Sequence, residues 1–188
     1  MQKIIDRMKN RSGQSLVEAI IALGILTTGL LGMLTLLTQS YYLNRVASAD
    51  TQATYLASEG VEIAKNLIDH DVYCWLDSAK TCPAPYTSPG WGTTCFGLIG
   101  INGSQDYELD YSTTGCPTIF ANRKLSFNTG THLYSYAGGG QATSFVRKIR
   151  VSRPSADEIE VQSIVTWNVG LITQQSIDLD DHFYNWRF

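Results

Sequence analysis

The sequence lacks the short motifs on which most hydrolases and nucleotide-binding enzymes depend. It has no G-x-S-x-G, no H-E-x-x-H and no P-loop, and its three histidines stand in no recognisable catalytic context. We therefore expect a protein that is not an enzyme and that carries no cofactor.

Charged residues are also scarce, at 16% of the 188 residues, and the formal net charge is only -3. The basic residues concentrate in the segment from Met1 to Gly13, which holds Lys3, Arg7, Lys9 and Arg11. The remainder is mildly acidic, so a polyanion such as DNA is possible as a partner but unsupported. The length allows one globular domain with an appendage rather than two separate cores.

The cysteines lack the C-x-x-C spacing that is typical of zinc ribbons and thioredoxin-like redox sites. An even set confined to one irregular stretch predicts two disulfides formed in an oxidising compartment, with three possible connectivities. Neighbour pairing is favoured, the first cysteine with the second and the third with the fourth. Alternatively, His70 and the first cysteine, which follows it by four residues, could form half of a metal site. The four cysteines are Cys74, Cys82, Cys95 and Cys116.

Proline is absent between Gln14 and Asp71, and no side chain is charged from Ala19 to Thr38. The uncharged run is rich in leucine and isoleucine and has the roughly 20 residues that a helix needs to cross a hydrocarbon core. Basic residues flank it only on the N-terminal side. The positive-inside tendency therefore predicts a single-pass membrane protein with a cytoplasmic leader and an external C-terminal domain.

Beyond the uncharged run, apolar residues recur at alternating spacings of four and three. This spacing makes one stripe along a helix and predicts a continuous helix from Gln14 to about Asp71, roughly 80 Å long at about 1.5 Å per residue. The second half of this helix needs a partner for its stripe, and the domain that follows is the expected one. The stripe comprises Tyr42, Val46, Ala49, Ala53, Leu56, Gly60, Ile63 and Leu67.

Glycine, proline, serine and asparagine dominate the next region, with short strands expected at Asp106 to Tyr111 and at Lys124 to Asn128. The C-terminal part has the alternation of strands at Phe145 to Val151, Ile159 to Trp167 and about Gln174 to Leu179. A turn at Arg153 to Asp157 separates the first two strands. We expect an α+β fold in which a three-stranded antiparallel meander packs on the second half of the helix.

These signals predict five segments. They are a basic leader at 1–13, a membrane-spanning half of the helix at 14–38, an amphipathic half at 39–69, a loop-rich region with disulfides at 70–143, and an antiparallel sheet at 144–188.

One stretch carries more specific information, because a basic leader ends at Gly13 and a lone acid, Glu18, follows inside an apolar helix. An unpaired carboxylate in hydrocarbon costs on the order of 3 kcal/mol or more. Gly13, Ser15, Leu16 and Glu18 match, position by position, the class III signal of type IV prepilins and type II secretion pseudopilins. The chain therefore resembles this family, and its order of segments is similar to the family's over the whole length. Two shorter stretches, Ala57 to Glu62 and Val165 to Trp167, are most similar to the minor pilins and minor pseudopilins.

The resemblance implies the type IV pilin fold and a structural function. A prepilin peptidase would cut between Gly13 and Gln14, and the new amino group of Gln14 would be methylated. An inner-membrane assembly platform would then transfer the subunit from membrane lipid into a pilus or pseudopilus, an extracellular or periplasmic filament of pilin subunits. Glu18 would pair with the cationic terminus of a neighbouring subunit, which agrees with the physical need for a partner.

The alternative function is a membrane-anchored or tip-located binding module for adhesion or DNA uptake. It would use the aromatic residues Trp75, Tyr86, Trp91, Tyr134 and Tyr136 in the loop-rich region.

Two charged groups have alternatives of their own. The basic strand residues could contact phosphates but are more typical of edge protection, whereas the acidic groups could bind calcium but are more typical of a solvated face. The basic residues are Arg147, Lys148, Arg150 and Arg153, and the acidic ones are Asp106, Glu108, Asp110, Asp178, Asp180 and Asp181.

Overall fold

The computed structural model describes the backbone of residues 2–76, 101–111, 117–169 and 173–185. Side chains are described within those ranges except at residues 2–14, 71–76 and 173. The chain divides into two compact units, Met1–Ser48 and Ala49–Phe188, and each is considered by itself below.

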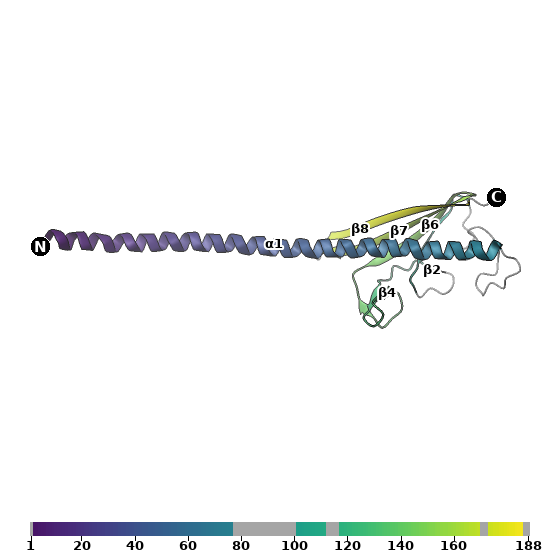
Figure 1. Ribbon diagram of the computed structural model, residues 1–188, viewed down its shortest axis with the longest axis horizontal. Helices are drawn as coiled ribbons and strands as arrows, with labels where there is room; N and C mark the ends of the chain where they lie inside the picture. Colours follow the sequence, from purple (N-terminus) through teal and green to yellow (C-terminus); the bar gives the residue numbers. More distant parts are fainter. Residues whose placement is uncertain (1, 77–100, 112–116, 170–172, 186–188) are drawn as a thin grey trace. The chain divides into compact units, whose positions relative to one another are not determined.

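Helix α1 runs from Gln2 to Leu76, 75 residues, and contributes to both units (Figure 1). It is longer than predicted at both ends. At the start, the leader contains lysine, arginine, methionine and isoleucine but no proline, so nothing in its sequence stops the helix at Gln14. At the other end, the helix continues past His70 for the same reason, because the next proline is Pro83.

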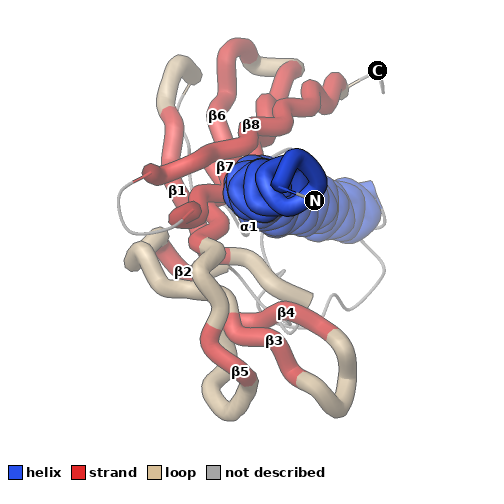
Figure 2. Tube along the Cα trace, turned by 90° about the vertical axis from the view of Figure 1, so that its left-hand side faces the viewer, coloured by secondary structure: helices blue, strands red, loops and turns tan. Residues whose placement is uncertain are grey.

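A five-stranded antiparallel sheet in the order β2-β1-β6-β7-β8 forms the framework of the second unit (Figure 2). Strands β6, β7 and β8 form the predicted meander, but the sheet gains β1 and β2 from the region expected to be rich in loops. The bounds are Ser104–Glu108 for β1, Thr118–Ile119 for β2, Val146–Ser155 for β6, Glu158–Val169 for β7 and Thr173–Tyr184 for β8.

The turn between β6 and β7 is tighter than predicted, since β6 continues to Ser155 with a register shift after Ser152. A second, three-stranded sheet has the order β4-β3-β5. Its strands are β3 at Ser126–Asn128, β4 at Leu133–Ser135 and β5 at Gln141–Ala142. The predicted strands at Asp106 and Lys124 thus appear as β1 and β3, displaced by two residues at their starts.

The core lies between the Ala49–His70 part of α1 and one face of the five-stranded sheet. Strand β7 shows the reason, because every second residue is buried and the intervening residues lie on the opposite face. Two clusters of buried side chains result, one around Ala64, Leu109 and Ile149 and the other around Leu56, Phe145 and Trp167. The fold is therefore α+β, with a long N-terminal helix packed on an antiparallel sheet, as the sequence predicts.

Gly60 allows the helix to approach the sheet closely. A Cβ atom at this position would lie 2.6 Å from Ile149 Cδ1 and 3.1 Å from Arg147 Cδ, and closer still to Ser163 Oγ. These separations are far below ordinary carbon contact distances of about 3.5–4.0 Å. Gly60 is thus the one described residue of α1 whose missing side chain is required by the packing of the sheet.

Candidate functional site: the exposed apolar helix

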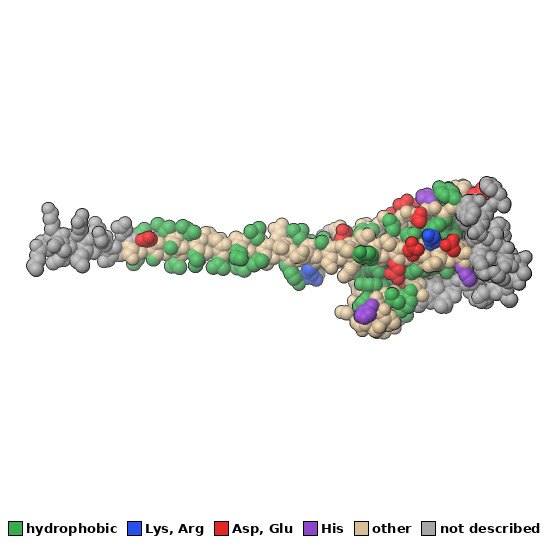
Figure 3. Space-filling view, in the orientation of Figure 1, with side chains coloured by type: hydrophobic (Ala, Val, Ile, Leu, Met, Phe, Trp, Pro, Cys, Tyr) green, Lys and Arg blue, Asp and Glu red, His purple; other side chains and the backbone are tan. Residues whose placement is uncertain are grey.

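The N-terminal unit presents an apolar helix surface that nothing in that unit covers. Every large apolar side chain from Leu16 to Leu43 is at least 52% exposed. Figure 3 shows hydrophobic side chains along the whole of this part of the helix. The helix is long and apolar enough to cross a membrane. Apolar surface of this extent is unfavourable in water and points to a lipid or protein environment.

Glu18 is the single acidic residue between Ser15 and Arg45, and its side chain is exposed. Among the described residues it takes part in no hydrogen bond or ion pair. The carboxylate therefore lies on an apolar surface with its electrostatic interactions unused. Any process that buries this surface must also provide a cation or a hydrogen-bond donor for Glu18.

The threonine side chains of the apolar helix are satisfied within the helix itself. Thr27 and Thr28 each donate a hydroxyl hydrogen bond to the carbonyl of Gly24 at 3.0 Å. Thr35 donates to the Gly32 carbonyl at 2.7 Å, and Thr38 donates to the Thr35 carbonyl at 2.8 Å. Because these hydroxyls need no external partner, the helix can enter an apolar environment at little cost for them. Glu18 differs from them in this respect.

Three glycines in the same stretch have no steric cause within the chain. A Cβ atom added at Gly24, Gly29 or Gly32 would meet no described atom within 4 Å. Each glycine costs about 1 kcal/mol of helix stability relative to alanine. No described residue packs closely against these three glycines, whereas the sheet packs closely against Gly60. Small residues of this kind allow close contact between helices in an apolar medium.

Aromatic and basic residues mark the end of the apolar surface. The Arg45 guanidinium lies over the ring of Tyr41 at 5.9 Å from its centroid, and Tyr42 is next in sequence. Tyrosine and arginine are typical of the boundary between hydrocarbon and water. The part of α1 that is suited to lipid therefore ends near Tyr41.

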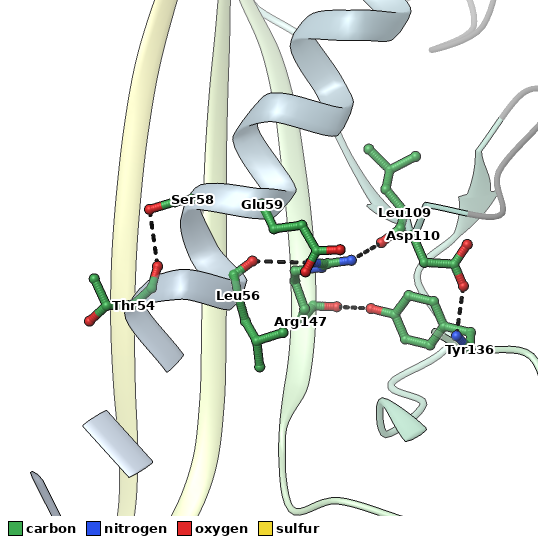
Figure 4. A network of polar contacts seen from close by, with 8 residues as sticks. All are labelled: Thr54, Leu56, Ser58, Glu59, Leu109, Asp110, Tyr136 and Arg147. Atoms are coloured by element: carbon green, nitrogen blue, oxygen red, sulfur yellow. Dashed lines mark hydrogen bonds and ion pairs between the residues drawn. The ribbon is translucent and has the colours of Figure 1, made fainter. Parts of the chain in front are cut away.

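In the second unit, Arg147 attaches the helix to the sheet (Figure 4). Its side chain is fully buried, and Nη1 donates hydrogen bonds to the Leu56 carbonyl at 3.0 Å and to Glu59 Oε2 at 3.1 Å. Nη2 donates to the Leu109 carbonyl at 2.5 Å. One guanidinium on β6 thus holds both α1 and the segment after β1. Such charge-assisted bonds are stronger than neutral ones.

Tyr136 extends this network. Its hydroxyl donates to the Arg147 carbonyl at 2.6 Å, and its backbone N–H donates to Asp110 Oδ2 at 2.7 Å. Burial raises the pKa of the Tyr136 hydroxyl to about 12, although the nearby Arg147 charge acts in the opposite direction. The hydroxyl therefore stays protonated at neutral pH and keeps donating.

The four basic strand residues do not lie together on one exposed surface. Arg147 is buried, while Lys148 and Arg150 both pair with Asp106, at 3.4 Å and 2.8 Å. The hydrogen bond from Arg150 holds the pKa of the Asp106 carboxyl below its usual value. Arg147 lies two residues from Ile149 and four from Val151, so its position on the inward face is a signal that sequence reasoning missed.

The prediction of a solvated face was wrong for two of the acidic residues. Glu108 and Asp110 are 2% and 4% exposed. Glu108 accepts hydrogen bonds from the backbone of Ala121 and Arg123 and from the Arg123 side chain. Asp178, Asp180 and Asp181 are exposed, as predicted. Among the described residues, no group of three or more histidine, cysteine, aspartate or glutamate side chains is arranged to hold a metal ion.

Several predicted site residues fall on parts of the chain that the structure does not describe. Only the backbone is described for Gly13, Gln14 and Cys74, and Cys82, Cys95 and Cys116 lie outside the described residues. The same holds for Trp75, Tyr86 and Trp91 of the alternative binding surface. The described residues therefore do not test the cleavage or disulfide predictions, and Glu18 is the residue of the predicted assembly site that they include.

Comparisons of this chain with protein-family models, with curated proteins and with solved structures found no significant match.

Proposed function

We propose that the chain is a structural subunit of a type IV pilus or of a type II secretion pseudopilus, and that it is a minor component. In this proposal a prepilin peptidase removes Met1 to Gly13, and the apolar helix anchors the subunit in the membrane. An assembly platform then builds it into a filament, helix against helix.

The observation that carries the proposal is Glu18, an exposed carboxylate on an apolar helix that has no hydrogen bond or ion pair among the described residues, five residues after Gly13. A plain membrane anchor accounts for the apolar surface, but it leaves the Glu18 carboxylate unpaired in hydrocarbon, which is energetically unfavourable. A filament accounts for both, since a neighbouring subunit's new N-terminal ammonium group can supply the missing charge. Pairing of one acid with one amine also fixes the axial register between helices.

The glycines of the apolar helix support the same proposal. Gly24, Gly29 and Gly32 have open space around them in the isolated subunit. In a bundle of apolar helices, positions without a Cβ let neighbouring backbones approach closely, and dispersion contacts increase. These contacts between subunits would offset the helix stability that the glycines lose in the isolated chain.

The proposal is tested by Glu18→Gln in cells that contain a matching assembly system and its peptidase. We expect the amount of subunit in sheared filaments to fall at least about tenfold, because the ammonium group of the neighbour would lose its counter-charge. The level of mature subunit in the membrane should stay unchanged, since Glu18 forms no hydrogen bond or ion pair with a described residue of its own chain.

Glu62→Gln is the matched control, because Glu62 is also an exposed glutamate of α1 but belongs to the second unit. It should leave incorporation at the wild-type level. Equal incorporation of the Glu18→Gln subunit and the wild type would refute the pairing role.

A further inference from the structure

A polar cleft lies in the second unit, on the sheet face opposite the helix. It has a volume of about 410 Å³ and is bounded by Asn102–Ser104, by Arg150–Pro154 of β6, and by Glu160 and Gln162 of β7. That volume falls in the range of small-molecule sites, roughly 300–1,000 Å³. Almost all of the lining side chains are polar, so the cleft suits a polar ligand.

The sheet register explains why these residues converge. Ser104 pairs with Ser152, and Ser152 pairs with Glu160, so the three side chains form one row across β1, β6 and β7. Arg150 and Gln162 form the adjacent row on the same face. The register shift after Ser152 then turns Arg153 and Pro154 out of the regular ladder to form the rim of the cleft.

Arg153 is a positively charged residue of the cleft, and the described part of the chain gives it only one side-chain hydrogen bond. Its Nη2 donates to the Ala156 carbonyl at 2.9 Å, but its Nε is buried and has no hydrogen-bond partner among the described residues. Arg153 also makes no ion pair within the described part of the chain, whereas Arg150 is neutralised by Asp106. The Nη1 group forms no hydrogen bond with a described residue and is not buried, so its N–H bonds can donate to an anionic oxygen in the cleft.

The opposite side of the cleft offers acceptors. Glu160 uses Oε2 to accept a hydrogen bond from the Ser152 hydroxyl at 2.6 Å. Its other carboxylate oxygen accepts no hydrogen bond from the residues that the structure describes. Gln162 donates its amide to Asp178, which leaves the amide oxygen available. These acceptors need donors, and a simple anion has few.

We infer that this cleft binds an acidic saccharide, a ligand that joins a carboxylate to several hydroxyl groups. The carboxylate accepts from Arg153, and the hydroxyls donate to Glu160 and Gln162. The inference goes beyond the proposed filament role and does not rest on it, because every residue involved belongs to the second unit.

The test is a titration of the isotope-labelled full-length chain in detergent micelles, followed by the backbone amide signals of Gly103, Ser104 and Arg153. Glucuronate is the probe, glucose supplies the hydroxyls without the carboxylate, and acetate supplies the carboxylate alone. We expect saturable shifts with glucuronate and an affinity at least about tenfold weaker for each of the other two.

Two variants should abolish the glucuronate response. Arg153→Gln removes the charge, and Ser104→Phe fills the cleft from an exposed strand position where an aromatic residue is well tolerated. Lys124→Gln is the matched control, since it removes one exposed positive charge outside the cleft and should bind as the wild type does.

Three results would overturn the inference. They are the absence of saturable shifts with glucuronate, equal affinities for glucuronate and acetate, and an unchanged response in both cleft variants. If Arg153→Gln fails to fold, Ser104→Phe alone decides between binding in the cleft and binding elsewhere.

Discussion

Gly60→Ala should destabilise the second unit even though alanine is the better helix former. The new Cβ would overlap Ser163 Oγ and lie 2.6 Å from Ile149 Cδ1. Overpacking of a well-packed core costs about 1–3 kcal/mol, and the gain in helix propensity returns about 1 kcal/mol. Because β7 is held by neighbours on both sides, its backbone cannot easily move away from the helix, and the buried Ser163 hydroxyl would have to change its rotamer. We expect a net loss of about 1–2 kcal/mol in the free energy of unfolding.

Ser163→Ala should rescue part of this loss. Ser163 Oγ is buried and has no hydrogen-bond partner among the described residues, so its removal relieves both the overlap and an unsatisfied hydroxyl. In the double variant about 1 kcal/mol of the lost free energy of unfolding should return, while the close contact with Ile149 should keep the rest. The pair should therefore be non-additive by about 1 kcal/mol.

The assay is urea unfolding of the full chain in micelles, followed by tryptophan fluorescence, because Trp167 is buried in the core of this unit. Gly29→Ala is the matched control. It makes the same substitution in the same helix at a position with open space and should leave the transition of the second unit unchanged. A Gly60→Ala variant as stable as the wild type, or strict additivity with Ser163→Ala, would refute the close approach of helix and sheet.

Three further predictions concern other parts of the molecule. Arg147→Met should lower the free energy of unfolding by about 2–4 kcal/mol, because the Leu109 carbonyl and Glu59 lose their donor; Arg147→Lys should restore part of it in the same urea assay. Tyr136 has its pKa raised from 10.0 to about 12, so it contributes stability that is complete below pH 10 and is lost as the pH rises towards 12. Tyr136→Phe should flatten that fall, and equal slopes for both proteins would contradict it. Gly29→Leu should leave unfolding of the second unit unchanged yet reduce incorporation into filaments, and normal incorporation would show that the glycine is not at a helix contact.

The periodic parts of the fold could be predicted from the sequence. The apolar stripe predicted the buried positions Ala53, Leu56 and Leu67, and the alternation in β7 identified its inward face. The stripe was too narrow, because a helix lying on a broad sheet also buries Ala57, Val61 and Ala64. It also extended too far, since Tyr42 is exposed. Local patterns report which face of an element is apolar but not how wide its partner is.

The polar interior could not be predicted in this way. The buried Arg147 donates hydrogen bonds to the carbonyls of Leu56 and Leu109, which are 91 and 38 residues away in the sequence. The buried Glu108 accepts hydrogen bonds from backbone N–H groups 13 and 15 residues away. No local pattern encodes such distant partners, so composition alone favoured exposed charges. In the apolar helix, by contrast, the important charged residue could be recognised from the sequence. Glu18 stood out in the sequence because its neighbours are uniformly apolar, and the structure leaves it exposed.

We propose that this chain is processed as a prepilin before it is assembled. Mass spectrometry of the mature N-terminus, after expression with a prepilin peptidase, tests this processing. We predict a first residue of Gln14, with loss of Met1 to Gly13. A chain that keeps these residues in the presence of active peptidase would contradict the account, and Glu18 would then belong to a simple membrane anchor.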